Sequence, residues 1–139
     1  MYDHLGIVTA DLSVARAFYD ACLAPLGFRC LQDNSVSANE GWLVYGSEPD
    51  KPFFVVAGGR PGFWPEDAKP ATSPMHIAFQ AADRAAVNQF HEQGLQHGGS
   101  DNGPPGDRPS NTPYYAAYLI DPDGNNVEAG FRGTDKDGR

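Results

Sequence analysis

The chain contains an internal repeat that limits the folds it can adopt. Residues 4–20, HLGIVTADLSVARAFYD, align without a gap on residues 76–92, HIAFQAADRAAVNQFHE, at an offset of 72. The identical pairs are His4 with His76, Ala10 with Ala82, Asp11 with Asp83, and Phe18 with Phe90. The same offset places VVAG at 55–58 over VEAG at 127–130. This period exceeds the roughly 20 to 50 residues of solenoids and propellers, so we expect two similar modules related by a pseudo-twofold axis.

The composition is that of one compact domain, and the acidic charge balance favours a small molecule as its partner. The 139 residues are 40% hydrophobic and 12% aromatic, enough for a core. A net charge of −8 argues against nucleic acid or an anionic membrane surface as a partner. No apolar run approaches the roughly 18 residues of a membrane span, and the first residues do not resemble a signal peptide. We therefore expect a cytoplasmic protein.

Hydrophobic periodicity and turn residues predict the same order of elements in both copies. In the first, a strand over 2–9 precedes a helix that Asp11 caps and that runs to Leu23, and strands follow over 28–31, 41–45 and 52–57. In the second, a strand over 75–80 precedes a helix capped by Asp83 and ended by Gly94. Strands over 114–120 and 126–131 close it as a hairpin around a tight turn at 121–125. The prediction is an α+β fold of two β-α-β-β-β modules, over about 1–58 and 74–132, in a single domain spanning 1–139.

Two connecting segments are unusually long. Residues 58–73 form a linker rich in Gly and Pro between the copies. Residues 98–113 are polar and rich in Pro and Gly, and they are too long for an ordinary connection. We interpret the latter as a mobile segment or a lid over a site, with a plain surface loop as the alternative.

Strand alternation separates a helix-packed face from an open face in each copy. Leu5, Ile7 and their counterparts in the second copy belong to the packed face. His4, His76 and Glu128 fall on the open face, with small neighbours at Gly6, Ala78 and Gly130. If the sheets curl around a common axis, these faces line one cavity and His4 approaches His76. Two imidazoles and one carboxylate hold a divalent transition metal and leave positions open for substrate.

Purely structural roles are the alternative explanation for these residues. A His near the start of a strand is commonly a structural hydrogen bonder, and we interpret His91 and His97 in that way. For the trio, the alternative to a metal site is a polar pocket without metal. Cys22 and Cys30, the two cysteines of the chain, are expected to be reduced structural thiols.

The chain resembles the vicinal oxygen chelate superfamily of glyoxalase I, extradiol dioxygenases, fosfomycin resistance enzymes and bleomycin-sequestering proteins. The resemblance rests on DHLGIVTADL with FYDACLAPLGF, on MHIAFQAAD, and on YYAAYLIDPDGNNVEAGF, of which DPDGNNVE is the most specific. It implies curved mixed sheets forming a cup-shaped cavity, and a homodimer whose cavity is built within one chain or across two. It also implies metal ligands from the first and last strand of each module, at His4, Val56, His76 and Glu128.

Val56 cannot bind a metal, and this departure separates the branches of the family. Glyoxalase I enzymes usually have an acidic ligand at that place, so lactoylglutathione lyase activity is disfavoured. Extradiol dioxygenases and fosfomycin-type enzymes use the two-His, one-Glu set that remains. The fosfomycin branch also uses basic residues to hold a phosphonate, and along the cavity strands we find only Arg132.

Two functional hypotheses follow. The first is a divalent-metal-dependent enzyme, a lyase or dioxygenase, in which Fe, Mn, Ni, Co or Zn held by His4, His76 and Glu128 chelates two adjacent oxygens of a small substrate. Tyr114 or Tyr118 then donates a hydrogen bond to a ligand, unless these tyrosines serve core or hairpin packing. The second is a metal-free protein of the bleomycin-resistance type that sequesters an aromatic compound among Trp42, Phe54, Trp64 and the tyrosines.

Overall fold

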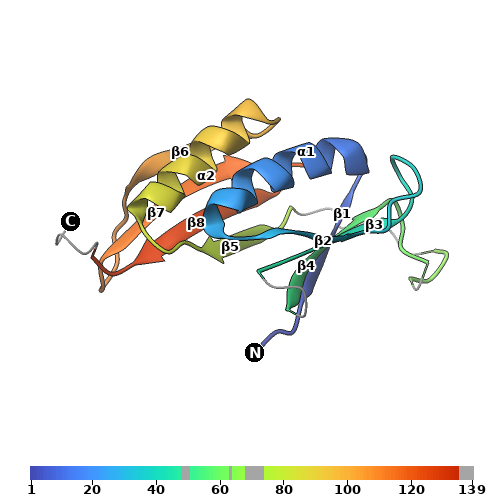
Figure 1. The fold of residues 1–139 in the computed structure, drawn as a ribbon, viewed down its shortest axis with the longest axis horizontal. Helices are drawn as coiled ribbons and strands as arrows, with labels where there is room; N and C mark the ends of the chain where they lie inside the picture. The colour runs from blue at the N-terminus through green and yellow to red at the C-terminus, as the bar shows by residue number, and fades with distance from the viewer. Residues whose placement is uncertain (48–50, 63, 68–73, 135–139) are drawn as a thin grey trace.

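The chain folds into two modules with the same order of elements (Figure 1). The computed structural model describes residues 1–47, 51–62, 64–67 and 74–134. The first module comprises β1 (Leu5–Thr9), α1 (Leu12–Leu23), the 3-10 turn η1 (Ala24–Leu26), β2 (Arg29–Asp33), β3 (Trp42–Gly46) and β4 (Pro52–Gly58). The second comprises β5 (His76–Gln80), α2 (Arg84–Gln96), β6 (Ser100–Asp107), β7 (Tyr114–Ile120) and β8 (Asn126–Arg132). The predicted α+β fold with a repeated β-α-β-β-β unit is confirmed.

Each module forms a mixed four-stranded sheet with its helix on one face. The strand orders are β1-β4-β3-β2 and β5-β8-β7-β6. The first and last strands of a module pair in parallel, and the other neighbours are antiparallel. Helices α1 and α2 lie side by side above the sheets (Figure 1). The sheets curl but do not close, so each keeps one face free of helices.

Both helices begin where the sequence predicts. The Asp11 side chain accepts hydrogen bonds from the amides of Ser13 and Val14, and the Asp83 side chain accepts one from Ala86. The buried faces of the helices contribute Phe18 and Phe90 to one continuous hydrophobic core. None of the described helices is long and apolar enough to span a membrane.

The second helix does not end at Gly94, as the sequence led us to expect. It continues to Gln96, and Gly94 lies buried within it. A Cβ atom on Gly94 would lie less than 3.0 Å from the Leu119 side chain of β7, and at 3.3 Å and 3.4 Å from Phe18 and Cys22 of α1. Glycine is therefore present for close packing of α2 against both elements, and not for a left-handed cap.

Half of the segment 98–113 is a strand and neither an unstructured loop nor a lid. Residues 100–107 form β6, the edge strand beside β7, although they include Pro104 and Pro105. Proline removes a backbone donor, so it is tolerated on an edge strand where that donor would face away from the sheet. The pairing of β6 with β7 is irregular around these prolines, because its register shifts on either side of Gly103. Part of the expected linker, residues 63 and 68–73, lies outside the described residues.

The turn between β7 and β8 ties the two modules together. Asp121, at 3% exposure, accepts hydrogen bonds from the Tyr19 hydroxyl of α1 at 2.6 Å and from the Asn125 amide at 2.8 Å. Asp123 in the same turn accepts bonds from the Thr9 hydroxyl at 2.6 Å and from the Ala10 amide at 2.9 Å. The predicted tight turn is thus present, and its carboxylates dock onto the β1–α1 junction of the first module.

Candidate functional site

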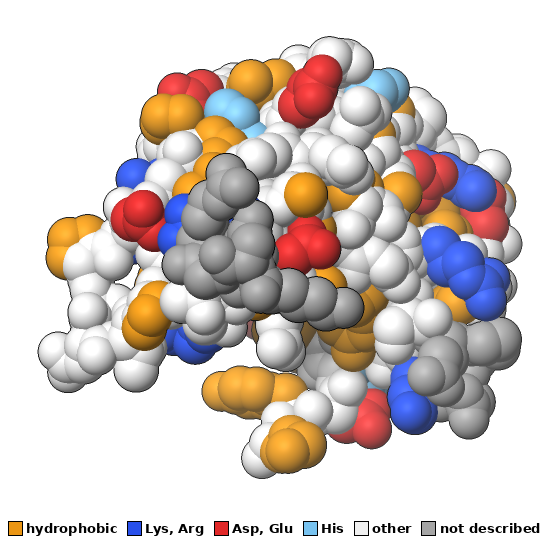
Figure 2. All heavy atoms as spheres, turned by 60° about the vertical axis from the view of Figure 1, so that its left-hand side comes forward, with side chains coloured by type: hydrophobic (Ala, Val, Ile, Leu, Met, Phe, Trp, Pro, Cys, Tyr) orange, Lys and Arg blue, Asp and Glu red, His pale blue; other side chains and the backbone are white. Residues whose placement is uncertain are grey.

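The chemically distinctive side chains gather on the helix-free face of the second sheet. On β8, Val127 and Ala129 face the core, so Glu128 points to the other side. On β7, Tyr118 lies directly opposite Glu128, and Tyr114 lies on the same face four residues away. Seen from the side of the second module, the surface mixes charged and apolar side chains, and it is indented at its lower edge (Figure 2).

His76 and Glu128 converge as the sequence analysis predicted. The Nε2 atom of His76 lies 3.1 Å from Oε2 of Glu128. The Glu128 side chain is 6% exposed and the His76 side chain is 53% exposed, so the imidazole lies between the buried carboxylate and the solvent. The Nδ1 atom of His76 lies 3.2 Å from the Asn126 carbonyl oxygen, which can only accept. This contact directs the Nε2 lone pair of a neutral His76 toward Glu128.

Tyr114 is the second group that fixes Glu128. Its hydroxyl donates a hydrogen bond to Oε1 of Glu128, and its ring lies over Gly130. A Cβ atom on Gly130 would lie less than 3.0 Å from the Tyr114 hydroxyl, so the space beside Gly130 is filled by this ring. Burial and the neighbouring Glu128 raise the pKa of Tyr114, and the same two causes raise the pKa of Tyr118. Both phenols therefore stay protonated near neutral pH, as hydrogen-bond donors.

Two arginines flank the tyrosines on the same face. The guanidinium carbon of Arg132 lies 4.1 Å from the centre of the Tyr114 ring, and that of Arg108 lies 5.0 Å from the centre of the Tyr118 ring. Sequence reasoning missed Arg108 because it follows β6, in the segment predicted to lack regular structure. The alternation of Gly and Pro with polar residues carries no strand signal, and only the pairing with β7 places Arg108 here.

His4 does not join this pair within one chain. It is 59% exposed, and its Nδ1 atom contacts the neighbouring Asp3 carboxylate at 2.6 Å. Across residues 1–47, 51–62, 64–67 and 74–134, no three His, Cys, Asp or Glu side chains group so that they could hold a metal ion. A single copy therefore brings together His76, Glu128 and Tyr114, with Tyr118 opposite Glu128, but leaves His4 apart.

The structural counterpart of Glu128 in the first module is Val55 and not Val56. Gly6 pairs with Val55, whereas Ala78, the counterpart of Gly6, pairs with Glu128. Val56 is fully buried in the core beneath the helices. The repeat offset of 72 is therefore wrong in the last strand, where it becomes 73. Since Val55 also lacks a ligand atom, the first module still supplies no metal ligand from β4.

Over β3 and β4 the helix-free face of the first sheet is apolar. Val44 lies opposite Val55 across β3 and β4, and Trp42, 49% exposed, lies opposite Ala57. Phe54, which we had expected to line a binding cavity, is instead buried in the core at 1% exposure. The two modules thus present different open faces, one apolar and one carrying acid, imidazole, phenol and guanidinium groups.

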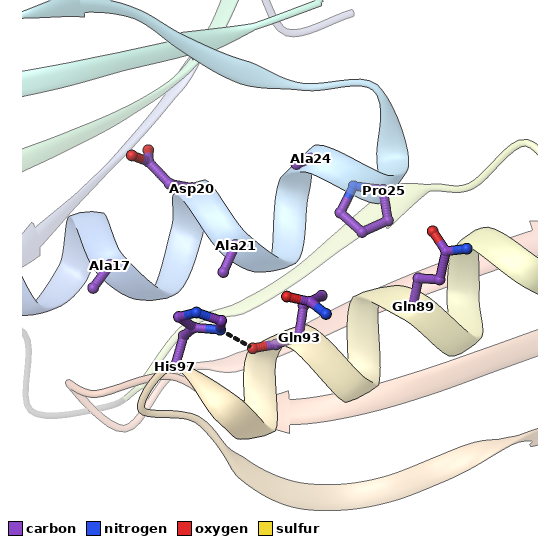
Figure 3. A pocket seen from close by; sticks show the side chains of 8 residues that line it. All are labelled: Ala17, Asp20, Ala21, Ala24, Pro25, Gln89, Gln93 and His97. Carbon is purple, nitrogen blue, oxygen red and sulfur yellow. Dashed lines mark hydrogen bonds between the residues drawn. The ribbon is translucent and has the colours of Figure 1, made fainter.

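A separate groove of about 660 Å³ lies between the two helices (Figure 3). Gln93 and His97, at the end of α2, face the small side chains of Ala17 and Ala21 on α1. The Nδ1 atom of His97 contacts the Gln93 carbonyl oxygen at 2.8 Å, and His91 contacts Asp101 at 2.8 Å through Nε2. Both histidines are structural hydrogen bonders, as predicted. Cys22 and Cys30 are free thiols whose pKa values are raised by burial, in agreement with a structural role.

Comparison with known proteins gives a consistent family. The sequence profile of the Glyoxalase/Bleomycin resistance protein/Dioxygenase superfamily matches residues 2–129. A glyoxalase/bleomycin resistance protein from Albidiferax ferrireducens T118 is 31% identical, with 95% of this chain and 99% of that chain covered and a TM-score of 0.75. A lactoylglutathione lyase from Agrobacterium tumefaciens is 19% identical, with 94% and 92% covered and a TM-score of 0.65, which supports the fold alone. No functionally curated protein sequence matches the chain.

Proposed function

Because the chain belongs to the glyoxalase/bleomycin resistance protein/dioxygenase superfamily, we propose that it is a divalent-metal-dependent enzyme acting on a small substrate with two adjacent oxygens. The observation that carries the proposal is the 3.1 Å approach of His76 Nε2 to Glu128 Oε2 on an open sheet face. A lyase or a dioxygenase is the reaction class that we favour, in a cytoplasmic homodimer.

The donor atoms fit a transition metal. Imidazole nitrogen and carboxylate oxygen are ligands that Fe, Mn, Ni, Co and Zn accept. If Nδ1 of His76 carries its proton toward the Asn126 carbonyl, the Nε2 lone pair faces a carboxylate oxygen, and this arrangement is favourable when a metal cation lies beside both atoms or when a proton on Nε2 bridges them. A bound metal would supply Lewis-acid stabilisation of negative charge on substrate oxygens.

The other polar groups hold Glu128 in place. Tyr114 donates to the Oε1 atom and leaves the Oε2 atom directed at His76. Tyr118 lies opposite Glu128 with its phenol protonated, so it can donate either to the carboxylate or to a substrate oxygen. We assign Glu128, Tyr114 and Tyr118 to the catalytic site, with Glu128 as a metal ligand and the phenols as donors.

We propose that the third ligand, His4, comes from a second copy of the chain. In one copy the modules are joined through the helices and through the contacts of Asp121 and Asp123, and their open faces do not bring His4 to His76. His4 is nevertheless exposed just before β1, at the position that corresponds to His76. A dimer could place the first module of one copy against the second module of the other. In such a dimer the apolar sheet face around Val55 would cover the polar sheet face that carries Glu128.

Metal content tests the proposal. Protein purified without chelators or a nickel column is expected to contain about one equivalent of transition metal per chain, measured by inductively coupled plasma mass spectrometry. His76→Ala and Glu128→Gln are expected to lose it, because each removes a ligand of the pair. His97→Ala is the matched control, since His97 lies in the groove between the helices. Absence of metal from wild-type protein, together with no uptake on dialysis against these ions, would contradict the proposal.

A metal-free sequestering protein is the second candidate, and the apolar face of the first sheet favours it. Trp42 is half exposed there beside Ala57, and it could stack on a flat aromatic ligand. This candidate predicts tight binding of planar aromatic compounds that is unchanged by a chelator and lost in Trp42→Ala. The metal enzyme predicts binding that depends on the chelator and on His76.

A further inference from the structure

We infer that the substrate carries an oxyanion group, a carboxylate or a phosphonate, which Arg108 and Arg132 recognise beside the Glu128 site. The inference rests on the proposed function, because it assumes that the same face binds the substrate. It adds a charge requirement that the pair of His76 and Glu128 does not imply.

Arg108 is held in place by neutral groups, and its charge reaches Asp101, whose pKa is lowered by His91 and also by Arg108, without an ion pair between the two. Its Nη2 atom donates to the carbonyl oxygens of Pro104 and, at 3.0 Å, of Ala116, and its guanidinium lies over the Tyr118 ring. Its Nε atom is buried without a hydrogen-bond acceptor. No acidic side chain of residues 1–47, 51–62, 64–67 or 74–134 forms an ion pair with it. A half-buried, positioned guanidinium of this kind is suited to bind an anion from solution.

Arg132 repeats the arrangement on the other tyrosine. It is exposed at the end of β8, stacks on Tyr114, and likewise has no ion pair among the described residues. Each arginine therefore rests on a phenol that lies beside or bonds to Glu128. In a chain with a net charge of −8, two arginines that form no ion pair among the described residues thus lie on one sheet face.

A third arginine, at the start of α2, shows the contrasting case. Arg84 lies over the ring of Tyr115, 4.7 Å from its centre, on the helix side of β7. It forms an ion pair with Asp107 at 3.0 Å. The stacking of arginine on tyrosine is thus the same on both faces of β7, but of these three arginines only the two of the open face form no ion pair within the described part of the chain.

Four probes that share a catechol ring separate charge recognition from metal chelation. They are catechol, 3,4-dihydroxybenzoate, 3,4-dihydroxyphenylphosphonate and the cationic 4-(2-aminoethyl)catechol. Their dissociation constants are measured by calorimetry and ligand-observed NMR, with the protein both metal-loaded and chelator-treated. We expect an anionic probe to bind about tenfold or more tightly than catechol, the effect of one charge-assisted hydrogen bond. The cationic probe should bind more weakly than catechol, and the tighter anionic probe identifies the oxyanion.

The variants assign the preference to residues. Arg108→Gln is expected to remove most of the difference in affinity between the anionic probe and catechol. Arg132→Gln, at an exposed position that does not affect folding, is expected to remove part of it. Arg84→Gln, the matched control, should leave the ratio unchanged. Any of three results overturns the inference. The first is equal affinity of wild-type protein for catechol and both anionic probes. The others are an affinity ratio that both open-face variants leave unchanged, and a loss of that ratio in Arg84→Gln as large as in those variants. Because the ratio is also measured without metal, an arginine-dependent ratio in protein that binds no metal leaves this inference standing while the metal proposal fails.

Discussion

Replacing Tyr19 with Phe removes the hydrogen bond through which the first helix holds the turn of the second module. The Tyr19 hydroxyl donates to Asp121 Oδ2 at 2.6 Å, with both side chains buried. Phe keeps the ring contacts with Phe18 and Phe54, whose ring centres lie 4.9 Å and 5.1 Å from that of Tyr19, so no cavity opens. A buried hydrogen bond to a charged group contributes about 1.5 to 3 kcal/mol. Asp121 retains the amide of Asn125, so we expect a loss of about 2 kcal/mol.

Two other tyrosines provide a graded comparison. Tyr45→Phe removes a bond to the half-exposed Asp20 at 2.8 Å, and we expect it to cost about 1 kcal/mol. Tyr115→Phe removes an exposed bond to Asn88 at 2.7 Å and should cost about 0.5 kcal/mol or less. Urea unfolding followed by far-ultraviolet circular dichroism, at one protein concentration and with unchanged m-values, measures all three. If Tyr19→Phe is no more destabilising than Tyr115→Phe, the turn does not hold the modules together.

Three further predictions concern glycines and pH. Gly130→Ala should destabilise the wild-type protein by about 1 to 3 kcal/mol, because the new Cβ meets the Tyr114 ring. The same substitution should cost nothing in a Tyr114→Ala background. Equal costs in the two backgrounds of this double-mutant cycle would refute the contact. Gly94→Ala should lower the free energy of unfolding by about 1 kcal/mol or more, despite the better helix propensity of Ala. The control Gln96→Ala, at an exposed position of the same helix, should not lower it. A higher melting temperature for Gly94→Ala would contradict the close packing of Gly94. Burial raises the pKa of Tyr19 above that of the unfolded chain, so above about pH 10 the unfolded state alone ionises and stability falls with a slope of about 1.4 kcal/mol per pH unit for this residue. Tyr19→Phe should reduce the measured slope of unfolding free energy between pH 10 and 11 by about 1 kcal/mol per pH unit, because the unfolded phenol is only partly ionised at pH 10. An unchanged slope would show that Tyr19 ionises freely.

Local patterns in the sequence predict most of the fold. The two Asp caps, the repeated order of elements and the turn at 121–125 follow from short-range chemistry, and alternation correctly places Glu128 opposite the core-facing Val127 and Ala129. The extent of α2 was mispredicted because Gly94 serves packing against Leu119, a contact distant in sequence. Strand β6 was missed because its residues pair with β7 despite unfavourable propensity.

The candidate site was predictable only where it depends on one strand pair. His76 and Glu128 come from the parallel neighbours β5 and β8, so alternation and the repeat suffice to bring them together. The position of His4 depends on how two modules, or two copies, are placed, and local sequence does not determine that. Val56 was misassigned because a gapless repeat cannot reveal a one-residue change in register. Arg108 could not be placed without the path of β6.

Metal binding by mixed dimers tests most directly the claim that His4 of one copy completes the site of His76 and Glu128 in another. Two variants that each lack one ligand, His4→Ala and His76→Ala, are co-expressed with different affinity tags, and dimers carrying both tags are isolated. In such a dimer one site loses both histidines and the other keeps both. We predict little metal in either variant alone and about one ion per mixed dimer, against about two in wild type. Mixed dimers as metal-poor as the separate variants would contradict the account.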